Sequence, residues 1–227
     1  MKKFMMDTKA ALGTAPKTED KDYDQKAADL KSIQKALSEY KSAMEKMKSA
    51  AQSFASAMAA MEKAFETLGK GEDATEEMKK MTKEYEAVSK KVNDQILTDF
   101  KKAIGDHEDM KGVKDLAADC KKLESSRNKV MAEYDTYRDS VDKKEQEYKK
   151  KNKDLSDSKH YHEEVAKRDS LKQEFEKADK EFKDKHAELE KEKVTAYSSG
   201  MSGYLMSTSH FLDSIEKELS HVAPKAA

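Results

Sequence analysis

Hydrophobic residues recur at alternating intervals of four and three in the first third of the chain. They are Ile33, Leu37, Tyr40, Met44, Met47, Ala51, Phe54, Met58, Met61, Phe65 and Leu68. This spacing is the heptad repeat of helices that pack along one another, and it continues for about five heptads. Within it, residues 49–61 carry no charge and many alanines, which is typical of a helix buried on more than one side. The pattern predicts a long helix at the centre of a helical assembly.

Two more helical patterns follow. The second comprises Met78, Met81, Tyr85, Val88, Val92, Ile96, Met110, Val113, Ala117, Cys120, Val130, Tyr134, Tyr137 and Val141, and the third comprises Leu171, Phe175, Ala178, Phe182, Val194, Tyr197, Met201, Tyr204, Phe211, Ile215 and Leu219. Polar breaks at 69–73 and 152–158 separate the patterns, and Thr18 is a candidate cap for the first. We expect three helices of roughly 50, 80 and 65 residues. Gly105 and Gly112 predict a bend in the second.

Helix length limits which segments can pair. Short connections make consecutive helices antiparallel, so a first helix of about 50 residues covers the second only to about residue 124. The remainder of the second helix, 125–152, can pair with the third alone. The expected fold is therefore an all-α, long, kinked, antiparallel three-helix coiled coil, with a three-helix body and a two-helix arm. The break at 152–158 lies at the far end of that arm.

The charge-free stretches 49–61 and 194–212 both fall in the body. A single three-helix coil would leave much of this apolar and small-residue surface exposed to water, so we expect a second copy to cover it. The expected homodimer has a six-helix central bundle and two projecting two-helix arms. Its candidate interface residues are Phe54, Met58, Met61, Tyr197, Met201, Tyr204, Phe211 and Ile215.

Composition favours an elongated helical protein over a compact globule. Of the residues, 36% are hydrophobic and 40% are charged, and 45 basic residues nearly balance 46 acidic ones. A coiled coil needs only an apolar stripe, whereas disordered chains more often combine high net charge with no such periodicity. Because the net charge is −1, any attraction to an anionic surface must be local. A single cysteine and the lack of a long apolar run predict a cytoplasmic protein without disulfides or a membrane span.

The sequence has no pattern typical of an enzyme, a cofactor site or a metal site. His160 and His162 would point to different sides of a helix, which argues against a zinc pair. The Gly-Lys-Gly at 69–71 lacks the ending of a phosphate-binding loop. Cys120 and most of the thirteen methionines occupy apolar seam positions, which favours packing. We expect no catalysis, no cofactor and no nucleic-acid partner.

Lysines cluster around the break between the second and third helices. Between residues 143 and 153, six lysines and two glutamates leave a local charge of +4. The lysines are Lys143, Lys144, Lys149, Lys150, Lys151 and Lys153, with Lys159 just beyond. Basic residues near an anionic bilayer contribute about 1 kcal/mol each, and two copies would act together. The residues alone leave two interpretations open, a hydrated helix end and a lipid contact.

The N-terminal residues are a second candidate for lipid contact. Drawn as a helix, they place Phe4 on an apolar face and Lys2 and Lys3 on a more polar one. Such a helix suits shallow insertion into a bilayer. A frayed tail is the alternative interpretation.

Four segments together resemble the BAR domain family, of the amphiphysin and endophilin kind, over about residues 12–222. LGTAPKTEDKDYDQ (12–25) is similar to the family's opening segment, and IGDHEDMKG (104–112) lies where family members bend their second helix. RNKVMAEYDTYRD (127–139) resembles the basic stretch of the distal second helix. AYSSGMSGYLMSTSHFLDSI (196–215) resembles the dimer segment of the third. The order, spacing and total length of these segments carry the resemblance.

The resemblance implies a BAR domain at 16–223, between an N-terminal extension, 1–15, and a C-terminal tail, 224–227. BAR domains form crescent-shaped antiparallel dimers that contact anionic membranes through their tips and concave face, and they sense or impose curvature in endocytosis and vesicle or tubule formation. For this chain, the resemblance implies a peripheral membrane protein that binds phosphatidylserine or phosphoinositides. Besides the lysines at the break, the implied lipid-binding residues are Lys121, Lys122, Arg127, Lys129 and Arg138. A coiled-coil scaffold that binds proteins and no lipid is the alternative hypothesis.

Overall fold

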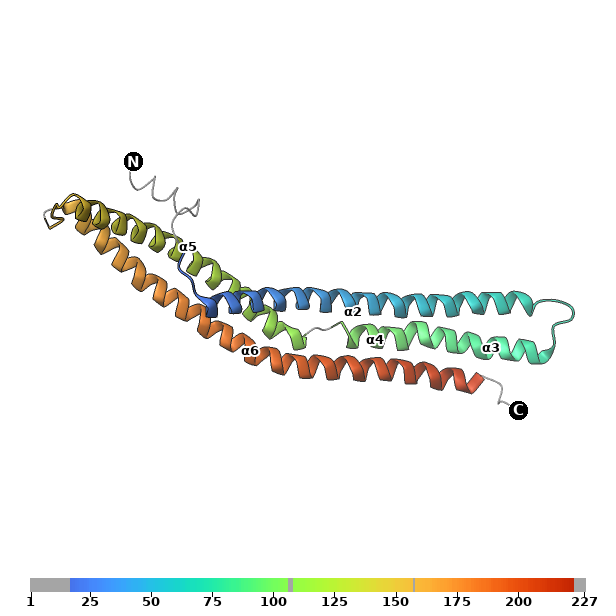
Figure 1. Cartoon of the computed structure of the whole chain (residues 1–227). Helices are drawn as coiled ribbons and strands as arrows, with labels where there is room; N and C mark the ends of the chain where they lie inside the picture. Colours follow the sequence, from blue (N-terminus) through green and yellow to red (C-terminus); the bar gives the residue numbers. More distant parts are fainter. Residues whose placement is uncertain (1–16, 106–107, 157, 223–227) are drawn as a thin grey trace. The chain divides into compact units, whose positions relative to one another are not determined.

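A computed structural model describes residues 17–105, 108–156 and 158–222 (Figure 1). The helices are α2 (Lys21–Leu68), α3 (Glu76–Lys91), α4 (Leu97–Ala103), α5 (Glu108–Lys150) and α6 (Lys159–Val222), and a π-helical turn, Val92–Ile96, joins α3 to α4. The described residues contain no β-strand, which confirms the all-α prediction. The N-terminal extension, with Lys2, Lys3 and Phe4, and the tail at 224–227 lie outside the described residues.

The helices begin and end close to the predicted breaks. Helix α2 ends at Leu68, and the break at 152–158 separates α5 from α6. The long second helix is interrupted at Gly105, where a Cβ atom would lie only 2.6 Å from the carbonyl oxygen of Lys101. Glycine therefore allows a backbone approach that another residue would obstruct. Gly112, by contrast, lies inside α5.

One predicted cap is wrong. Helix α2 begins at Lys21, and the amide of Tyr23 donates a hydrogen bond of 3.0 Å to Oδ1 of Asp20. Asp20 therefore caps the helix, as aspartate commonly does. Thr18 lies two residues further out, where its amide and hydroxyl both donate to the carboxylate of Asp135 on α5.

The described chain divides into two compact units. Unit 1 contains residues 17–34 and the described part of 113–193, and unit 2 contains 35–105, 108–112 and 194–222. In the second helix, the division therefore falls at residues 112 and 113.

Unit 1 is built on α5 and the first part of α6, which run side by side from the loop that joins them (Figure 1). Its apolar core includes Leu30, Val113, Ala117, Cys120, Val141, Leu171, Phe182 and Leu189. Tyr23 packs edge-on against Phe182, and Tyr134 stacks on Phe175 across the two long helices. The first turns of α2 thus share a core with α5 and α6.

Unit 2 has one hydrophobic core to which α2, α3, α4 and α6 all contribute. The core comprises Met44, Ala51, Ala55, Met58, Val88, Val92, Ile96, Leu97, Phe100, Ile104, Phe211 and Ile215. Phe100 stacks on Phe211 with ring centroids 4.3 Å apart. The π-helical turn adds a residue to the helix locally, so that Val92, Ile96 and Leu97 are all buried.

Unit 2 also carries a large uncovered apolar surface. The twelve large hydrophobic residues exposed in the described chain all belong to it: Phe54, Met61, Phe65, Leu68, Met78, Met81, Val194, Tyr197, Met201, Leu205, Met206 and Leu212. The first heptad pattern is therefore divided, because Met44, Ala51 and Met58 face the core while Phe54 and Met61 do not. Part of the predicted seam is therefore exposed to solvent in a single chain.

Candidate membrane-contact surface

The candidate surface is the turn in unit 1 that joins α5 to α6. At the end of α5, the amide of Lys153 donates to the carbonyl of Tyr148 at 3.0 Å, and the amide of Asn152 donates to that of Lys149 at 3.2 Å. Asn152 has a φ of 52°, so the three features together form a Schellman motif. Local backbone hydrogen bonds therefore close the end of α5, and no lysine side chain is needed to do so.

The start of α6 is closed in a similar way. The hydroxyl of Ser158 accepts a hydrogen bond from the amide of Tyr161 at 3.3 Å, so Ser158 caps the helix. In the loop before it, Asp154 accepts hydrogen bonds from the amide and the hydroxyl of Ser156, which lower the pKa of its carboxyl. Local hydrogen bonds thus close both helix ends at this turn.

Three of the seven lysines predicted at this turn form ion pairs. Lys143 lies 2.6 Å from Asp139, one turn back along α5, and Lys144 lies 2.6 Å from Glu164 on α6. Lys151 pairs with Glu147, whose pKa is lowered by the hydrogen bond that it accepts from the ammonium group. These pairs reduce the charge that the turn offers to a partner.

The other four lysines, which we call the free tip lysines, are Lys149, Lys150, Lys153 and Lys159. All four are exposed. None of their ammonium groups forms an ion pair or hydrogen bond with another residue that the structure describes. Residues 143–160 contain seven lysines and four acidic residues, so their net charge is +3. The turn is therefore a positive patch in which four cations are available to a ligand.

The residues predicted for the face of α5 lie in different environments. Lys121 pairs with Glu124 at 2.7 Å and Lys122 with Asp119 at 2.9 Å, and both lysines remain mostly exposed. Lys129 is exposed and has no ion pair with a described residue. Of these three lysines, two are therefore paired and one has no ion pair with a described residue.

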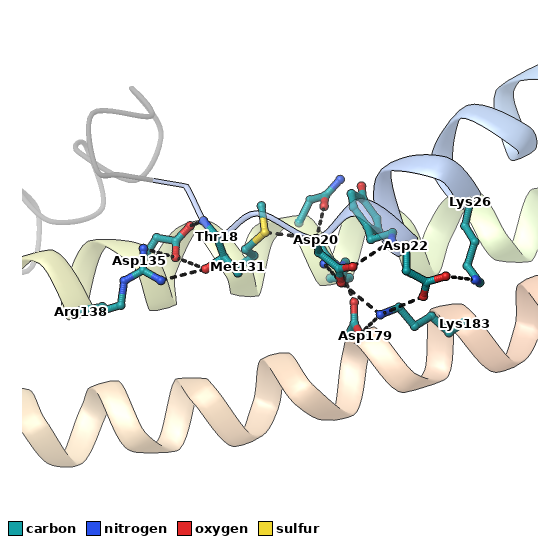
Figure 2. Close-up of polar contacts among 12 residues, drawn as sticks. Thr18, Asp20, Asp22, Lys26, Met131, Asp135, Arg138, Asp179 and Lys183 are labelled. Carbon is teal, nitrogen blue, oxygen red and sulfur yellow. Dashed lines mark hydrogen bonds and ion pairs between the residues drawn. The ribbon is translucent and has the colours of Figure 1, made fainter.

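Arg138 and Thr18 complete a small cluster at Asp135, whose carboxylate is buried. Nη2 of Arg138 lies 3.1 Å from Oδ1 of Asp135, and Nη1 donates to the hydroxyl of Thr18 at 3.0 Å (Figure 2). The hydroxyl of Thr18 itself donates to Asp135 at 2.6 Å. Arg138 is therefore engaged in fastening the start of the described chain to α5.

The burial of Arg127 contradicts the expectation that it contacts lipid. Its side chain has no exposed surface. Nε donates to Asp179 at 2.8 Å, Nη2 donates to Asp20 at 3.2 Å, and the guanidinium lies 3.5 Å from the centre of the Tyr23 ring. A guanidinium enclosed by two carboxylates and an aromatic ring cannot reach a headgroup while unit 1 is folded. Its role is to join α2, α5 and α6.

Lys183 extends this cluster on α6 (Figure 2). Its ammonium group lies 3.1 Å from Asp20, 3.2 Å from Asp22 and 2.8 Å from Asp179. Burial opposes its charge, but the hydrogen bonds to the three carboxylates outweigh burial and hold its pKa well above the usual value. Burial likewise opposes the ionisation of Asp20, yet the Tyr23 amide and Lys183 leave its pKa lowered. Both shifts favour the charged forms of Asp20 and Lys183.

The sequence interpretation did not identify the partners of Arg127. Asp20 and Asp179 are distant from it along the chain, so no local pattern connects the three. One signal was available, however. Arg127 lies seven residues after Cys120 and seven before Tyr134, which places it on the apolar seam of its helix. A charged residue on a seam predicts a buried ion pair.

The predicted dimer residues fall into two groups. Met58, Phe211 and Ile215 belong to the core of unit 2, so the chain itself covers them and they offer little surface to a second copy. For these three, the interface role stays a prediction. The others remain accessible: Phe54, Met61, Tyr197 and Met201 are exposed, and Tyr204 is half-buried.

No protein-family model matches the chain, and no curated protein matches it. Within the described ranges, no helix combines the length and apolar character that crossing a bilayer requires. The same residues include no group of three or more His, Cys, Asp or Glu side chains that could hold a metal ion.

Proposed function

We propose that this protein is a homodimeric, BAR-type protein that senses or generates membrane curvature and binds anionic bilayers electrostatically, in endocytosis or vesicle and tubule trafficking. The observation that carries the proposal is the set of four free tip lysines on a closed helical turn. A lysine that has no carboxylate partner loses no ion pair when it meets a lipid phosphate, and it therefore contributes its full attraction.

The proposed dimer is a crescent in which unit 2 of one chain packs against unit 2 of another. Its support is the uncovered apolar surface of unit 2, since patches of this kind on single chains usually mark an interface. An apolar groove of about 510 Å³, lined in part by Phe65, Leu68, Met78 and Met81, adds to that surface. Dimerisation would provide two sets of tip lysines in one particle.

We expect membrane binding through one set of tip lysines to be weak, and binding through the two sets of a dimer to be stronger. Four basic residues contribute about 4 kcal/mol per tip near an anionic leaflet at low salt. Linking two tips raises the effective affinity by roughly two to four orders of magnitude if both can reach the same membrane. Because the lysines are exposed, salt should screen the attraction strongly. Lys121, Lys122 and Lys129 on α5 are secondary contacts in this proposal.

Cosedimentation with liposomes tests the proposal. The wild-type chain should bind vesicles that contain phosphatidylserine or phosphoinositides, and this binding should weaken as the salt concentration increases. It should not bind vesicles of neutral lipid. The variant Lys149→Glu, Lys150→Glu, Lys153→Glu should bind at least about a hundred-fold more weakly, because it replaces three attractions by three repulsions. Electron microscopy of the vesicles would show whether binding produces tubules.

A matched charge reversal on α2 is the control. Lys31, Lys41 and Lys46 are exposed and have no ion pair with a described residue, so Lys31→Glu, Lys41→Glu, Lys46→Glu changes the total charge equally. This variant should retain most of the binding. Equal losses in the two variants would show that total charge, and not the tip, determines binding. No salt-sensitive binding by the wild type would reject the lipid function.

A protein scaffold is the second candidate function. The uncovered apolar surface of unit 2 favours it as well, because a different protein could occupy that surface. The same chain would then retain partners from a membrane-free extract, show no vesicle binding, and lose the partners when Met201 is replaced by lysine. Lysines in the last turn of α5 would then serve only to complement the helix dipole.

A further inference from the structure

We propose that His160 and His162 make the turn between α5 and α6 a proton-sensitive membrane contact, so that binding to anionic bilayers strengthens as the pH falls from about 7.5 to about 5.5. The inference rests on the proposed lipid contact and adds a regulation to it. Histidine is the side chain whose charge ordinarily changes in this range, and each added proton would increase the positive charge of the patch.

Both histidines lie in the first turn of α6, next to Lys159. Both are exposed, and the side chain of His160 is 80% accessible. The remaining described histidines lie elsewhere: His186 is buried in unit 1, and His210 and His221 are on the part of α6 that belongs to unit 2. Of the described histidines, these two are therefore the ones that lie at the turn.

The hydrogen bond of His162 determines where its second proton goes. Nε2 of His162 lies 2.8 Å from the carbonyl oxygen of Ser156. A carbonyl oxygen can only accept, so Nε2 carries the hydrogen and Nδ1 is the atom that takes up a proton. Protonation keeps this hydrogen bond and gives it a charged donor, which strengthens it. The loop geometry is thus compatible with both charge states.

His160 lies beside a carboxylate. Its Nδ1 is 3.4 Å from Oε2 of Glu163, one turn along α6, and both side chains are largely exposed. Protonation would convert this contact into an ion pair that water screens well. Protonation of His160 would still raise the net charge of the turn by one, because the ion pair adds no new negative charge.

The elements that meet at this turn carry charged groups of both signs. Glu163 lies on α6, Lys153 and Asp154 lie in the loop, and Glu145, Lys149 and Lys150 lie on α5, while the Tyr161 ring packs edge-on against His162. Carboxylates and ammonium groups ordinarily titrate outside the range between pH 5 and 8. Histidine is therefore the residue type at this turn whose charge ordinarily changes in that range. Two added protons would raise the net charge of the turn by two.

The expected gain is large enough to measure. One positive charge near an anionic leaflet strengthens binding by about five-fold, so two histidines give up to about 25-fold per tip at low salt. Wild-type protein should therefore bind much more tightly at pH 5.5 than at pH 7.5. Added salt should reduce the difference, because the effect is electrostatic.

The test is vesicle cosedimentation of the full chain at pH 7.5 and 5.5, at constant ionic strength. Vesicles of phosphatidylglycerol in neutral lipid are the probe, because a phosphodiester keeps its charge across this range whereas a phosphoinositide monoester does not. The variant His160→Gln, His162→Gln should bind like wild type at pH 7.5 and lose most of the gain at pH 5.5. Glutamine at 162 retains an N–H that can donate to Ser156.

The matched control is His210→Gln, His221→Gln, which removes two exposed histidines from unit 2. It should keep the full gain at pH 5.5. The proposal is overturned if the variant at 160 and 162 keeps that gain, or if the control loses it. Wild-type binding that depends on salt but not on pH would also overturn it, while leaving the proposed function intact. Absence of binding at both pH values would instead reject the proposed function.

Discussion

At the scale of the residue, Arg127 shows how a charged side chain can serve as a core residue. Its position on the seam points it into unit 1, where Asp20 and Asp179 neutralise it and Tyr23 lies over its plane. Removing one partner of a buried pair leaves an uncompensated charge, which costs more than the intact pair contributes. Two nitrogen atoms of the guanidinium donate to these carboxylates in a fixed geometry that lysine cannot reproduce.

We therefore expect Arg127→Met to lower the free energy of unfolding of unit 1 by roughly 3 kcal/mol. Lys183 would still neutralise Asp20 and Asp179 in part. The loss should therefore lie at the lower end of the range observed when one partner of a buried ion pair is removed. Urea unfolding followed by circular dichroism measures the loss, and hydrogen exchange in the first turns of α2 assigns it to unit 1. Lys129→Met, at an exposed position on the same helix, should change stability by no more than about 0.5 kcal/mol. Equal effects of the two substitutions would contradict this assignment.

At the scale of the element, helix ends proved more predictable than irregularities within helices. Glycine and polar clusters at 69–73 and 152–158 end helices because they carry the residues that favour turns. The π-helical turn at 92–96 has no such composition. It forms because an extra residue there lets successive apolar side chains face the core of unit 2. This packing depends on the neighbouring helices, so the local sequence does not predict it.

The end of α5 depends on the left-handed conformation of Asn152. A branched side chain in this conformation is strained by about 1–2 kcal/mol, whereas glycine is not. We expect Asn152→Val to lower the free energy of unfolding by about that amount, and Asn152→Gly to leave it unchanged or slightly higher. Both substitutions preserve charge, so thermal or urea unfolding reports on the turn alone. Equal stability of the two variants would show that residue 152 is not held in this conformation.

At the scale of the whole molecule, the main expectation is self-association through unit 2. We expect wild-type protein to sediment as a dimer. Tyr197→Lys with Met201→Lys should raise the dimer dissociation constant by roughly a hundred-fold or more, because each change places a charge on the apolar surface. Analytical ultracentrifugation over a range of concentrations measures this directly.

The control for this experiment adds the same two charges to unit 1. Ser170 and Gln173 are exposed on α6, and Ser170→Lys with Gln173→Lys should leave the dimer intact. A wild-type chain that remains monomeric at high concentration would refute the proposed dimer. It would also leave the uncovered apolar surface for a different protein.

The sequence by itself determined the helical content, the positions of most helix ends and the cluster of lysines at 143–159. These features depend on local spacing and turn composition, which act over a few residues. Tertiary structure decided that Lys144 is paired, because it meets Glu164 only when α5 and α6 are packed. It also buried Arg127 and divided the first heptad pattern into covered and uncovered halves. The physical reason is that burial, and ion pairing between helices, depend on residues far apart in the chain. A local sequence pattern does not predict which of these residues come together.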